Sequence, residues 1–245
     1  MRRKLTFSAR RTMLGAFCIL VFSGSLQCQT NQTTPGCRDI ATIPPILTFG
    51  GPGTAPAKGN EVGFAAGAYG SLFPAPCAHE TGIDWFGRWR YGISNRFDLG
   101  ADFQGAEHSS DQVLAVKLAA RYALLRNLRL EAGVGLGDDT EGKSLNAEVG
   151  ATAGIPTMDK NWESYASIRL AAAHGYAGKV FGLGTSVPPG ALVPMASFGA
   201  TAHVAENMRW IFEAGGGGIL SREHLNAGMF VYVSTGLSFT VRRKP

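Results

Sequence analysis

Apolar and polar residues alternate one by one along most of the chain between residues 61 and 241. The stretch TGIDWFGRWRYGI, residues 81–93, divides into two sets of alternate positions, and we call each set a parity. Trp89 belongs to one parity, and Arg88 and Arg90 belong to the other. A period of two residues is typical of a β-strand, because successive strand side chains point to opposite faces of the sheet. The same alternation recurs in segment after segment, so we predict about ten strands, within a range of about 8 to 12.

The connections between these segments alternate in length. SNR at residues 94–96 and RN at residues 126–127 are short, whereas HGYAGKVFGLGTSVPPG at residues 174–190 is long. The short group also includes PTMDKN and AENM. The mostly longer group also includes FPAPCAHE, EHSSD, GDDTEGK and SREH. Short turns on one rim and longer loops on the other are typical of antiparallel barrels that span a membrane. We therefore predict an all-β transmembrane antiparallel up-and-down β-barrel, with both ends of the sheet at the short-turn rim.

The chain before the first predicted strand has two parts. Residues 1–28 have the features of a secretory signal peptide, because basic residues precede an apolar run too short to span a membrane. Residues 29–60 are rich in Thr, Pro and Gly without a helix or strand period, and we predict an irregular N-terminal arm there. The β-barrel domain is expected to cover residues 61–245.

Three of the four cysteines bear on export. Cys28 lies at the expected cleavage site, and SLQC resembles a lipoprotein signal only loosely, so lipidation and simple cleavage both stay open. Cys37 and Cys77 would enter an oxidising compartment, where a disulfide bond can form. In the predicted topology they lie at opposite rims, so a bond would require the arm to thread the barrel. The arm could instead plug the lumen or serve as a tether.

The net charge changes when the signal peptide is set aside. The chain has 23 Lys and Arg against 18 Asp and Glu, and five of the basic residues lie in MRRKLTFSARR, which leaves 18 of each sign. The exported part is therefore neutral. This balance gives no reason to expect a nucleic-acid partner.

Bulky aromatic residues of the apolar parity gather beside the short turns. A soluble barrel would pack the apolar parity inward, but a core has no reason to concentrate aromatic rings at one end of its strands. A lipid headgroup region does favour amphipathic rings at that height. We therefore expect the apolar parity to face lipid. The predicted aromatic girdle consists of Tyr91, Phe97, Tyr122, Trp162, Trp210 and Phe239.

The other parity carries charges of opposite sign on neighbouring strands. Such charges need partners if they face the inside of a narrow barrel, because they lose contact with water there. The many glycines and alanines of this parity also suit a barrel whose interior is filled by side chains. Arg129 and Glu163 share this parity. The predicted lumen charge network consists of Arg88, Arg90, Asp98, Asp102, Lys117, Arg121, Glu131, Glu148 and Arg169.

With these features the sequence resembles the bacterial outer-membrane β-barrel family, over the whole chain from about residue 61. The segment STGLSFTV also resembles the C-terminal assembly signal of that family at Ser234, Gly236, Phe239 and Val241. The resemblance implies an outer-membrane location, the lipid bilayer as environment and the barrel-assembly machinery as a partner. RRKP follows the motif here, whereas members of the family usually end at or next to the terminal Phe.

Candidate chemistry is sparse in this sequence. The five histidines show no H-x-x-x-H spacing and the cysteines no C-x-x-C spacing, so we expect no metal and no cofactor. A lipid-modifying enzyme would need Ser, His and an acid to converge on one rim. His174 with Ser167 or Glu163 is the nearest candidate set, but His174 has the opposite parity from the other two.

We therefore expect a non-enzymatic outer-membrane barrel with a narrow, charge-filled lumen. Its role would be structural, in surface contacts, or in very limited passage of small solutes. The alternatives are a barrel-embedded lipid-modifying enzyme and an exported soluble β-barrel that binds an apolar ligand. The ligand or solute and the oligomeric state are left open.

Overall fold

The computed structural model describes residues 51–73, 81–108, 111–139, 142–157, 159, 161–175, 192–218, 220 and 229–241. Within them the chain forms ten β-strands and no helix long and apolar enough to cross a membrane. The strands are β1 (Asn60–Phe73), β2 (Thr81–Gly92), β3 (Phe97–His108), β4 (Asp111–Leu125), β5 (Leu128–Asp139), β6 (Gly142–Ile155), β7 (Trp162–Gly175), β8 (Leu192–Ala205), β9 (Met208–Gly218) and β10 (Met229–Val241).

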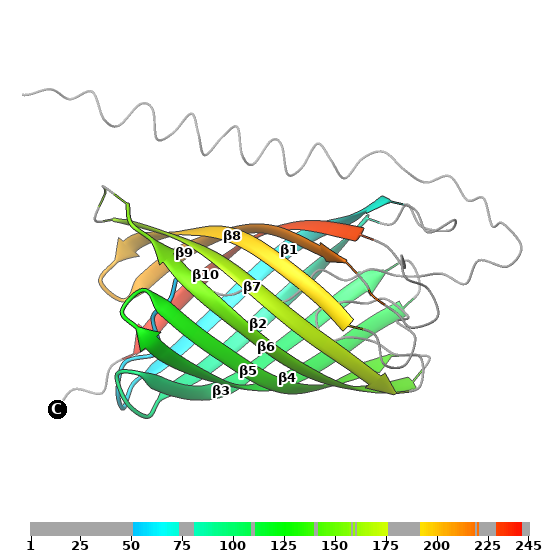
Figure 1. The fold of residues 1–245 in the computed structure, drawn as a ribbon, viewed down its shortest axis with the longest axis horizontal. Helices are drawn as coiled ribbons and strands as arrows, with labels where there is room; N and C mark the ends of the chain where they lie inside the picture. Colours follow the sequence, from blue (N-terminus) through cyan, green and yellow to red (C-terminus); the bar gives the residue numbers. More distant parts are fainter. Residues whose placement is uncertain are drawn as a thin grey trace, which may run out of the picture. The chain divides into compact units, whose positions relative to one another are not determined.

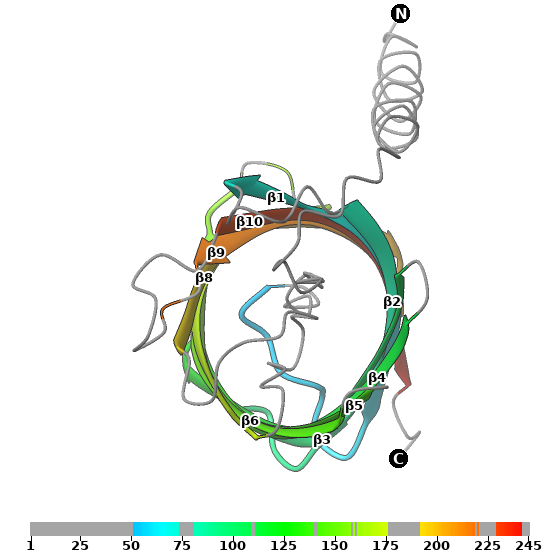
Figure 2. The ribbon, with the colours of Figure 1, turned by 90° about the vertical axis from the view of Figure 1, so that its right-hand side faces the viewer.

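The ten strands form one closed antiparallel barrel (Figure 1). Every strand pairs with its neighbours in the sequence, and β1 closes the sheet against β10 from Asn60↔Val241 to Phe73↔Met229. Figure 2 shows the closed ring of strands end-on. Closure leaves no strand edge with unpaired backbone groups. The predicted all-β up-and-down barrel of about ten strands is confirmed.

The rim that carries the short connections also carries the first residue of β1 and the last residue of β10, as predicted. We call it the short-turn rim. Its turns are closed by backbone hydrogen bonds, among them Ile93 N–H to Phe97 O at 2.9 Å. On the opposite, long-loop rim, residues 74–80, 176–191 and 221–228 lie outside the described residues.

Two connections at the long-loop rim are shorter than the sequence suggests. β3 continues to His108 and pairs there with Asp111 of β4, and β5 continues to Asp139 opposite Gly142 of β6. EHSSD and GDDTEGK were expected to form longer loops because they are polar. Backbone pairing does not depend on side-chain polarity, so the ladders run on through them.

The two faces of the barrel wall differ sharply in polarity. Leu118 on the outside is 62% exposed, whereas its sequence neighbour Lys117 on the inside is 1% exposed. The same contrast holds for Ile168 at 67% and Arg169 at 7%. The apolar parity therefore forms the outer surface and the charged parity fills the interior, the reverse of a soluble barrel.

The arm joins β1 at Asn60. Its described part, Gly51–Gly59, lies inside the ring of strands (Figure 2). At the short-turn rim a turn reverses the chain into β1: Gly59 N–H donates to Pro56 O at 2.8 Å, and Lys58 has a positive φ of 57°. The signal peptide, Cys28, Cys37 and Cys77 lie outside the described residues, so these predictions stay as they are.

Candidate functional site: the charged lumen

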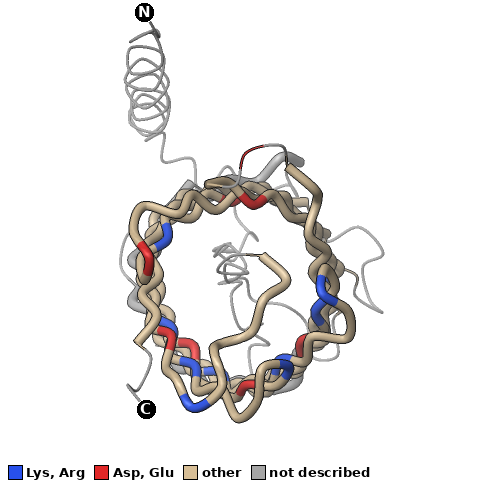
Figure 3. Tube along the Cα trace, turned by 90° about the vertical axis from the view of Figure 1, so that its left-hand side faces the viewer, with Lys and Arg blue, Asp and Glu red and all other residues tan. Residues whose placement is uncertain are grey.

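Twelve charged side chains of the described residues are buried inside the barrel. Six are cationic and six are anionic, so their formal charges cancel. Figure 3 shows the two signs side by side along the wall. The cations are Arg88, Arg90, Lys117, Arg121, Arg129 and Arg169, and the anions are Glu61, Asp98, Asp102, Glu131, Glu148 and Glu213.

Asp102 on β3 has the shortest contacts with several cations at once. It accepts hydrogen bonds from Arg88 Nε at 2.7 Å and from Arg90 Nη2 at 2.8 Å, both on β2. Lys117 Nζ of β4 lies 3.4 Å from its Oδ2 atom. Arg88, Asp102 and Lys117 are direct partners in the strand register, so the sheet itself brings the three together.

A second cross-strand pair lies closer to the short-turn rim. Arg121 of β4 is opposite Asp98 of β3, and its Nε and Nη2 atoms donate to the two carboxylate oxygens, each at 2.9 Å. Glu61 of β1 adds a third charge, with its Oε1 atom 3.6 Å from Arg121 Nη2. The bidentate geometry makes Asp98–Arg121 one of the stronger kinds of ion pair.

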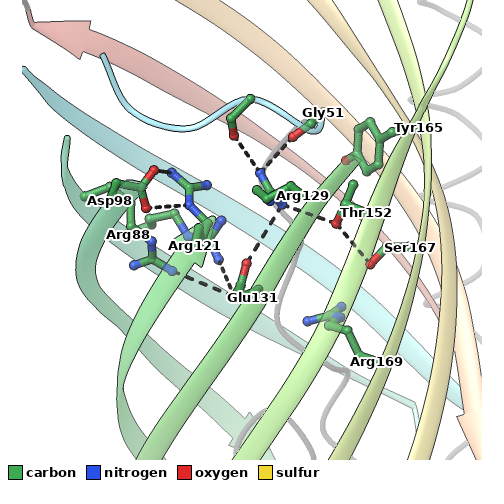
Figure 4. A network of polar contacts seen from close by, with 12 residues as sticks. Gly51, Arg88, Asp98, Arg121, Arg129, Glu131, Thr152, Tyr165, Ser167 and Arg169 are labelled. Carbon is green, nitrogen blue, oxygen red and sulfur yellow. Dashed lines mark hydrogen bonds and ion pairs between the residues drawn. The ribbon is translucent and has the colours of Figure 1, made fainter. Parts of the chain in front are cut away.

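Glu131 and Glu148 join the charges of β2 and β4 to those of β5, β6 and β7. Glu131 lies among four cations, at 3.5 Å from Lys117, 3.8 Å from Arg88, 3.9 Å from Arg129 and 4.0 Å from Arg90. Glu148 lies 3.2 Å from Lys117 Nζ and 3.7 Å from Arg169 Nη1. The predicted network residues thus form one connected cluster, partly shown in Figure 4, apart from Asp98 and Arg121, which pair beside it.

Glu213 on β9 ends the network on the opposite wall. Its two carboxylate oxygens accept hydrogen bonds from Tyr165 at 2.8 Å and from Tyr232 at 2.7 Å. Arg169 Nη2 lies 3.8 Å from it. The predicted set lacked three of the twelve buried charges, Glu61, Arg129 and Glu213, and also both tyrosines. Their parity in the alternation was the available signal, because each lies on the same side of its strand as the predicted charges.

Glu163 is much more exposed than the other charges of its parity, although it lies beside the arm: a Cβ atom built on Gly51 would come within 3.2 Å of its Oε2 atom. It lies at the short-turn rim, its side chain is 48% exposed, and its Oε1 atom is 3.2 Å from Nε2 of His203. Alternation fixes the direction of a side chain but not its depth, and near a rim an inward side chain still reaches water.

Long side chains of the lumen lie over glycines of the neighbouring strand. A Cβ atom added to Gly150 would come within 2.6 Å of Arg169 Cγ, and one added to Gly133 would come within 3.0 Å of Lys117 Cδ. These glycines therefore leave the space in which the charged chains lie flat against the wall.

The predicted girdle residues lie on the outer face near the short-turn rim. Tyr91, Tyr122 and Trp162 are exposed, and Trp210 donates from Nε1 to Thr235 Oγ1 at 2.7 Å. Phe97 and Phe239 are half-buried. Aromatic rings on the outer face extend beyond the predicted girdle, since five others of the described residues are exposed there: Phe64, Trp85, Trp89, Phe103 and Phe198.

The residues of the predicted assembly signal alternate across β10. Ser234 and Gly236 face the lumen, and Phe239 and Val241 face outward at the end of the strand. The motif is therefore part of the strand that closes the barrel against β1.

The described residues hold no group of three or more His, Cys, Asp or Glu side chains placed to bind a metal ion. His203 is the one histidine whose side chain the structure describes, and its partner is Glu163. Ser167 lies in the lumen, hydrogen bonded to Thr152 at 3.4 Å. The side chain of His174 lies outside the described part, so the Ser, His and acid set is not tested.

No protein-family model matches this chain, and no curated protein matches it either. Solved structures of similar fold include an outer-membrane channel from Pseudomonas putida F1, with 10% identity and a TM-score of 0.45 over 80% of this chain and 100% of the other. A bacterial polysaccharide outer-membrane secretin matches with 10% identity and a TM-score of 0.43, over 76% and 99% of the two chains.

The outer-membrane protease OmpT from Escherichia coli matches with 10% identity and a TM-score of 0.41, over 76% and 98% of the two chains. The similar structures thus include both channels and a protease. In fold, the chain is similar to bacterial outer-membrane β-barrels.

Proposed function

We propose that the protein is a non-enzymatic barrel of the bacterial outer membrane, with a lumen that charged side chains close to all but very small solutes. Its main role is then structural, in the integrity and surface contacts of the cell envelope. The observation that carries the proposal is the distribution of polarity, with an apolar outside and a charged, buried inside.

The outer face supports a lipid environment. Large apolar side chains are exposed on nine of the ten strands, all except β9, and soluble monomers rarely expose contiguous apolar patches of such extent. A bilayer core would solvate these side chains, and a closed barrel leaves it no unpaired backbone group. The aromatic residues near the short-turn rim would then lie at headgroup height.

The lumen supports closure rather than an open pore. A ten-strand barrel is only slightly wider than one that its own side chains fill. Arg88, Arg90, Lys117 and Arg121 are nearly inaccessible to solvent although they are charged. In a wide aqueous channel such side chains would be hydrated instead of being bound to one another.

One further role belongs to the same proposal. The assembly signal at Ser234, Gly236, Phe239 and Val241 would be recognised by the barrel-assembly machinery before β10 pairs with β1.

Fractionation of the host's membranes followed by planar-bilayer recording tests the proposal. We expect the protein in the outer-membrane fraction, extraction only with detergent, heat-dependent gel mobility, and brief or very small conductance. Extraction without detergent would favour the soluble, ligand-binding alternative. A large steady conductance would refute the closed lumen, and hydrolysis or acylation of radiolabelled phospholipid or lipopolysaccharide would refute the non-enzymatic role.

A further inference from the structure

The described part of the arm, Gly51–Gly59, occupies the lumen at the short-turn rim (Figures 2 and 3). Gly51, Ala55 and Gly59 are buried there, so the backbone of the arm is enclosed at these three positions. A segment that enters a barrel in this way fills part of the cross-section that the wall leaves free. Its contacts with the wall decide whether it is a fixed part of the fold or a separable one.

Two charged residues of the lumen bind the backbone of this segment. Arg129 Nη1 donates hydrogen bonds to Gly51 O at 2.7 Å and to Gly53 O at 3.0 Å, as Figure 4 shows in part. Asp98 Oδ2 accepts a hydrogen bond from the N–H of Ala55 at 2.7 Å. The cation thus meets carbonyl groups and the anion meets an N–H group. Hydrogen bonds with one charged partner are stronger than neutral ones.

Asp98 and Arg129 each have partners in the barrel wall in addition to their contacts with the arm. Asp98 has two hydrogen bonds to Arg121, and Arg129 lies 3.9 Å from Glu131 and 3.4 Å from Thr152 Oγ1. If the arm left, neither charged side chain would be stranded in the barrel interior. Departure of the arm therefore lacks the large penalty that breaking a buried ion pair carries.

The attachment of the arm to the sheet is short as well. A single isolated bridge, Ala57↔Gly92, joins it to β2, whereas each barrel strand has a ladder along its length. Beyond the bridge, Thr54 Oγ1 donates to Asn95 O at 3.1 Å at the rim. The arm is bound by a few hydrogen bonds through backbone atoms and can detach without unzipping a strand.

From these contacts we infer that residues Gly51–Gly59 form a removable plug, which Arg129 and Asp98 bind from the lumen wall and whose release opens a path for small hydrated ions. The inference rests on the proposed membrane barrel and adds the way in which its lumen is regulated. The charged network narrows the lumen on one side, and the plug closes the part next to the short-turn rim.

Ala55→Pro in the full chain tests the plug directly. The substitution removes the N–H that Asp98 binds and leaves the wall unchanged. Loss of a hydrogen bond to a charged group corresponds to at least about a tenfold rise in the ratio of open to closed time, measured by planar-bilayer recording in KCl. The matched control is Ala57→Pro. Residue 57 is the second residue of the turn closed by Gly59 N–H and Pro56 O, where proline is favoured, and the hydrogen bonds of the bridge to Gly92 are made by Lys58 N–H and Gly59 O.

A cross-link keeps the test decisive if Ala55→Pro assembles poorly. A Cβ atom built on Gly154 of β6 lies 2.9 Å from Pro52 Cγ, so Pro52→Cys with Gly154→Cys places two thiols at bonding range. Cys28, Cys37 and Cys77 are replaced by serine in this variant. We expect a closed barrel when oxidised and frequent openings after reduction, since Pro52→Cys and Gly154→Cys loosen the seat of the plug.

The outcomes separate this inference from the proposed function. Equal conductance of Ala55→Pro, Ala57→Pro and the wild type, or no change on reducing the formed cross-link, in barrels with heat-dependent gel mobility would overturn the plug alone. Absence from the membrane or loss of heat-dependent mobility in the wild type would overturn the membrane barrel itself.

Discussion

Two parts of the barrel wall fill the lumen with different kinds of side chain. The first wall consists of β2 to β7, and the second wall consists of β8, β9, β10 and β1. Ten of the twelve buried charges lie on the first wall, and only Glu61 and Glu213 on the second. The second wall instead presents hydroxyl groups and glycines to the lumen, with Tyr232 bound to Glu213. The first wall is secured by ion pairs between its own strands. The two charges of the second wall form ion pairs only with the first wall, Glu61 with Arg121 and Glu213 with Arg169.

This difference teaches where a single substitution should matter. A buried ion pair costs much to break, because the remaining partner is left charged and unpaired. A buried neutral hydrogen bond contributes less, and an unpaired hydroxyl contributes nothing favourable. Substitutions that preserve side-chain shape on the two walls therefore form a graded series.

Asp102→Asn should have the largest effect. It removes the negative charge that Arg88, Arg90 and Lys117 share, and leaves three cations with fewer partners. We expect a loss of about 3–5 kcal/mol in the free energy of unfolding, measured by urea unfolding of the barrel in lipid vesicles. The matched control is Asp159→Asn on an exposed turn, with a change of about 0.5 kcal/mol or less. Equal effects of the two would show that the lumen is hydrated.

Tyr232→Phe should have an intermediate effect. It removes the hydroxyl that donates to Glu213, while Tyr165 still donates at 2.8 Å. A hydrogen bond to a charged group contributes about 1.5–3 kcal/mol to the free energy of unfolding. The same urea titration measures it, with Tyr122→Phe on the exposed outer face as the control. A loss as large as that of Asp102→Asn would abolish the distinction between the walls.

Thr201→Val should have the smallest effect, and its sign is the informative part. Thr201 is fully buried on β8, and its hydroxyl has no hydrogen-bond partner among the described residues. Valine keeps the shape and removes a desolvated polar group, so we expect the free energy of unfolding to stay equal or to rise by about 1 kcal/mol. A marked loss of stability would mean that a water molecule or another partner binds this hydroxyl.

Much of the barrel could be predicted because alternation is a local property. The side of Leu118 and the side of Lys117 follow from their parity alone, and so did the inward direction of the nine predicted charges. The short turns at residues 94–96 and 126–127 could also be predicted, because an alternating segment lies on each side of each turn. Glu61 and Glu213 were within reach of the same reasoning, since their parity matches that of the network.

The pairing of charges could not be predicted, because it depends on strand register. Asp102 meets Arg88 and Lys117 only because the three positions are opposite one another across β2, β3 and β4. A shift of one residue would send each of them to the other face of the sheet. Depth was hidden as well, as Glu163 at the rim shows, and so was the extent of β3 and β5 through polar stretches.

The sequence by itself determined the fold class, the strand count and which parity turns outward, since these depend on periodicity and on turns between neighbouring segments. Only the tertiary structure decided which charges meet, how β1 closes on β10, and where the arm goes. Arg129 reaches Gly51 across 78 positions of the chain, and no local pattern encodes a contact between segments that only the closed barrel brings together.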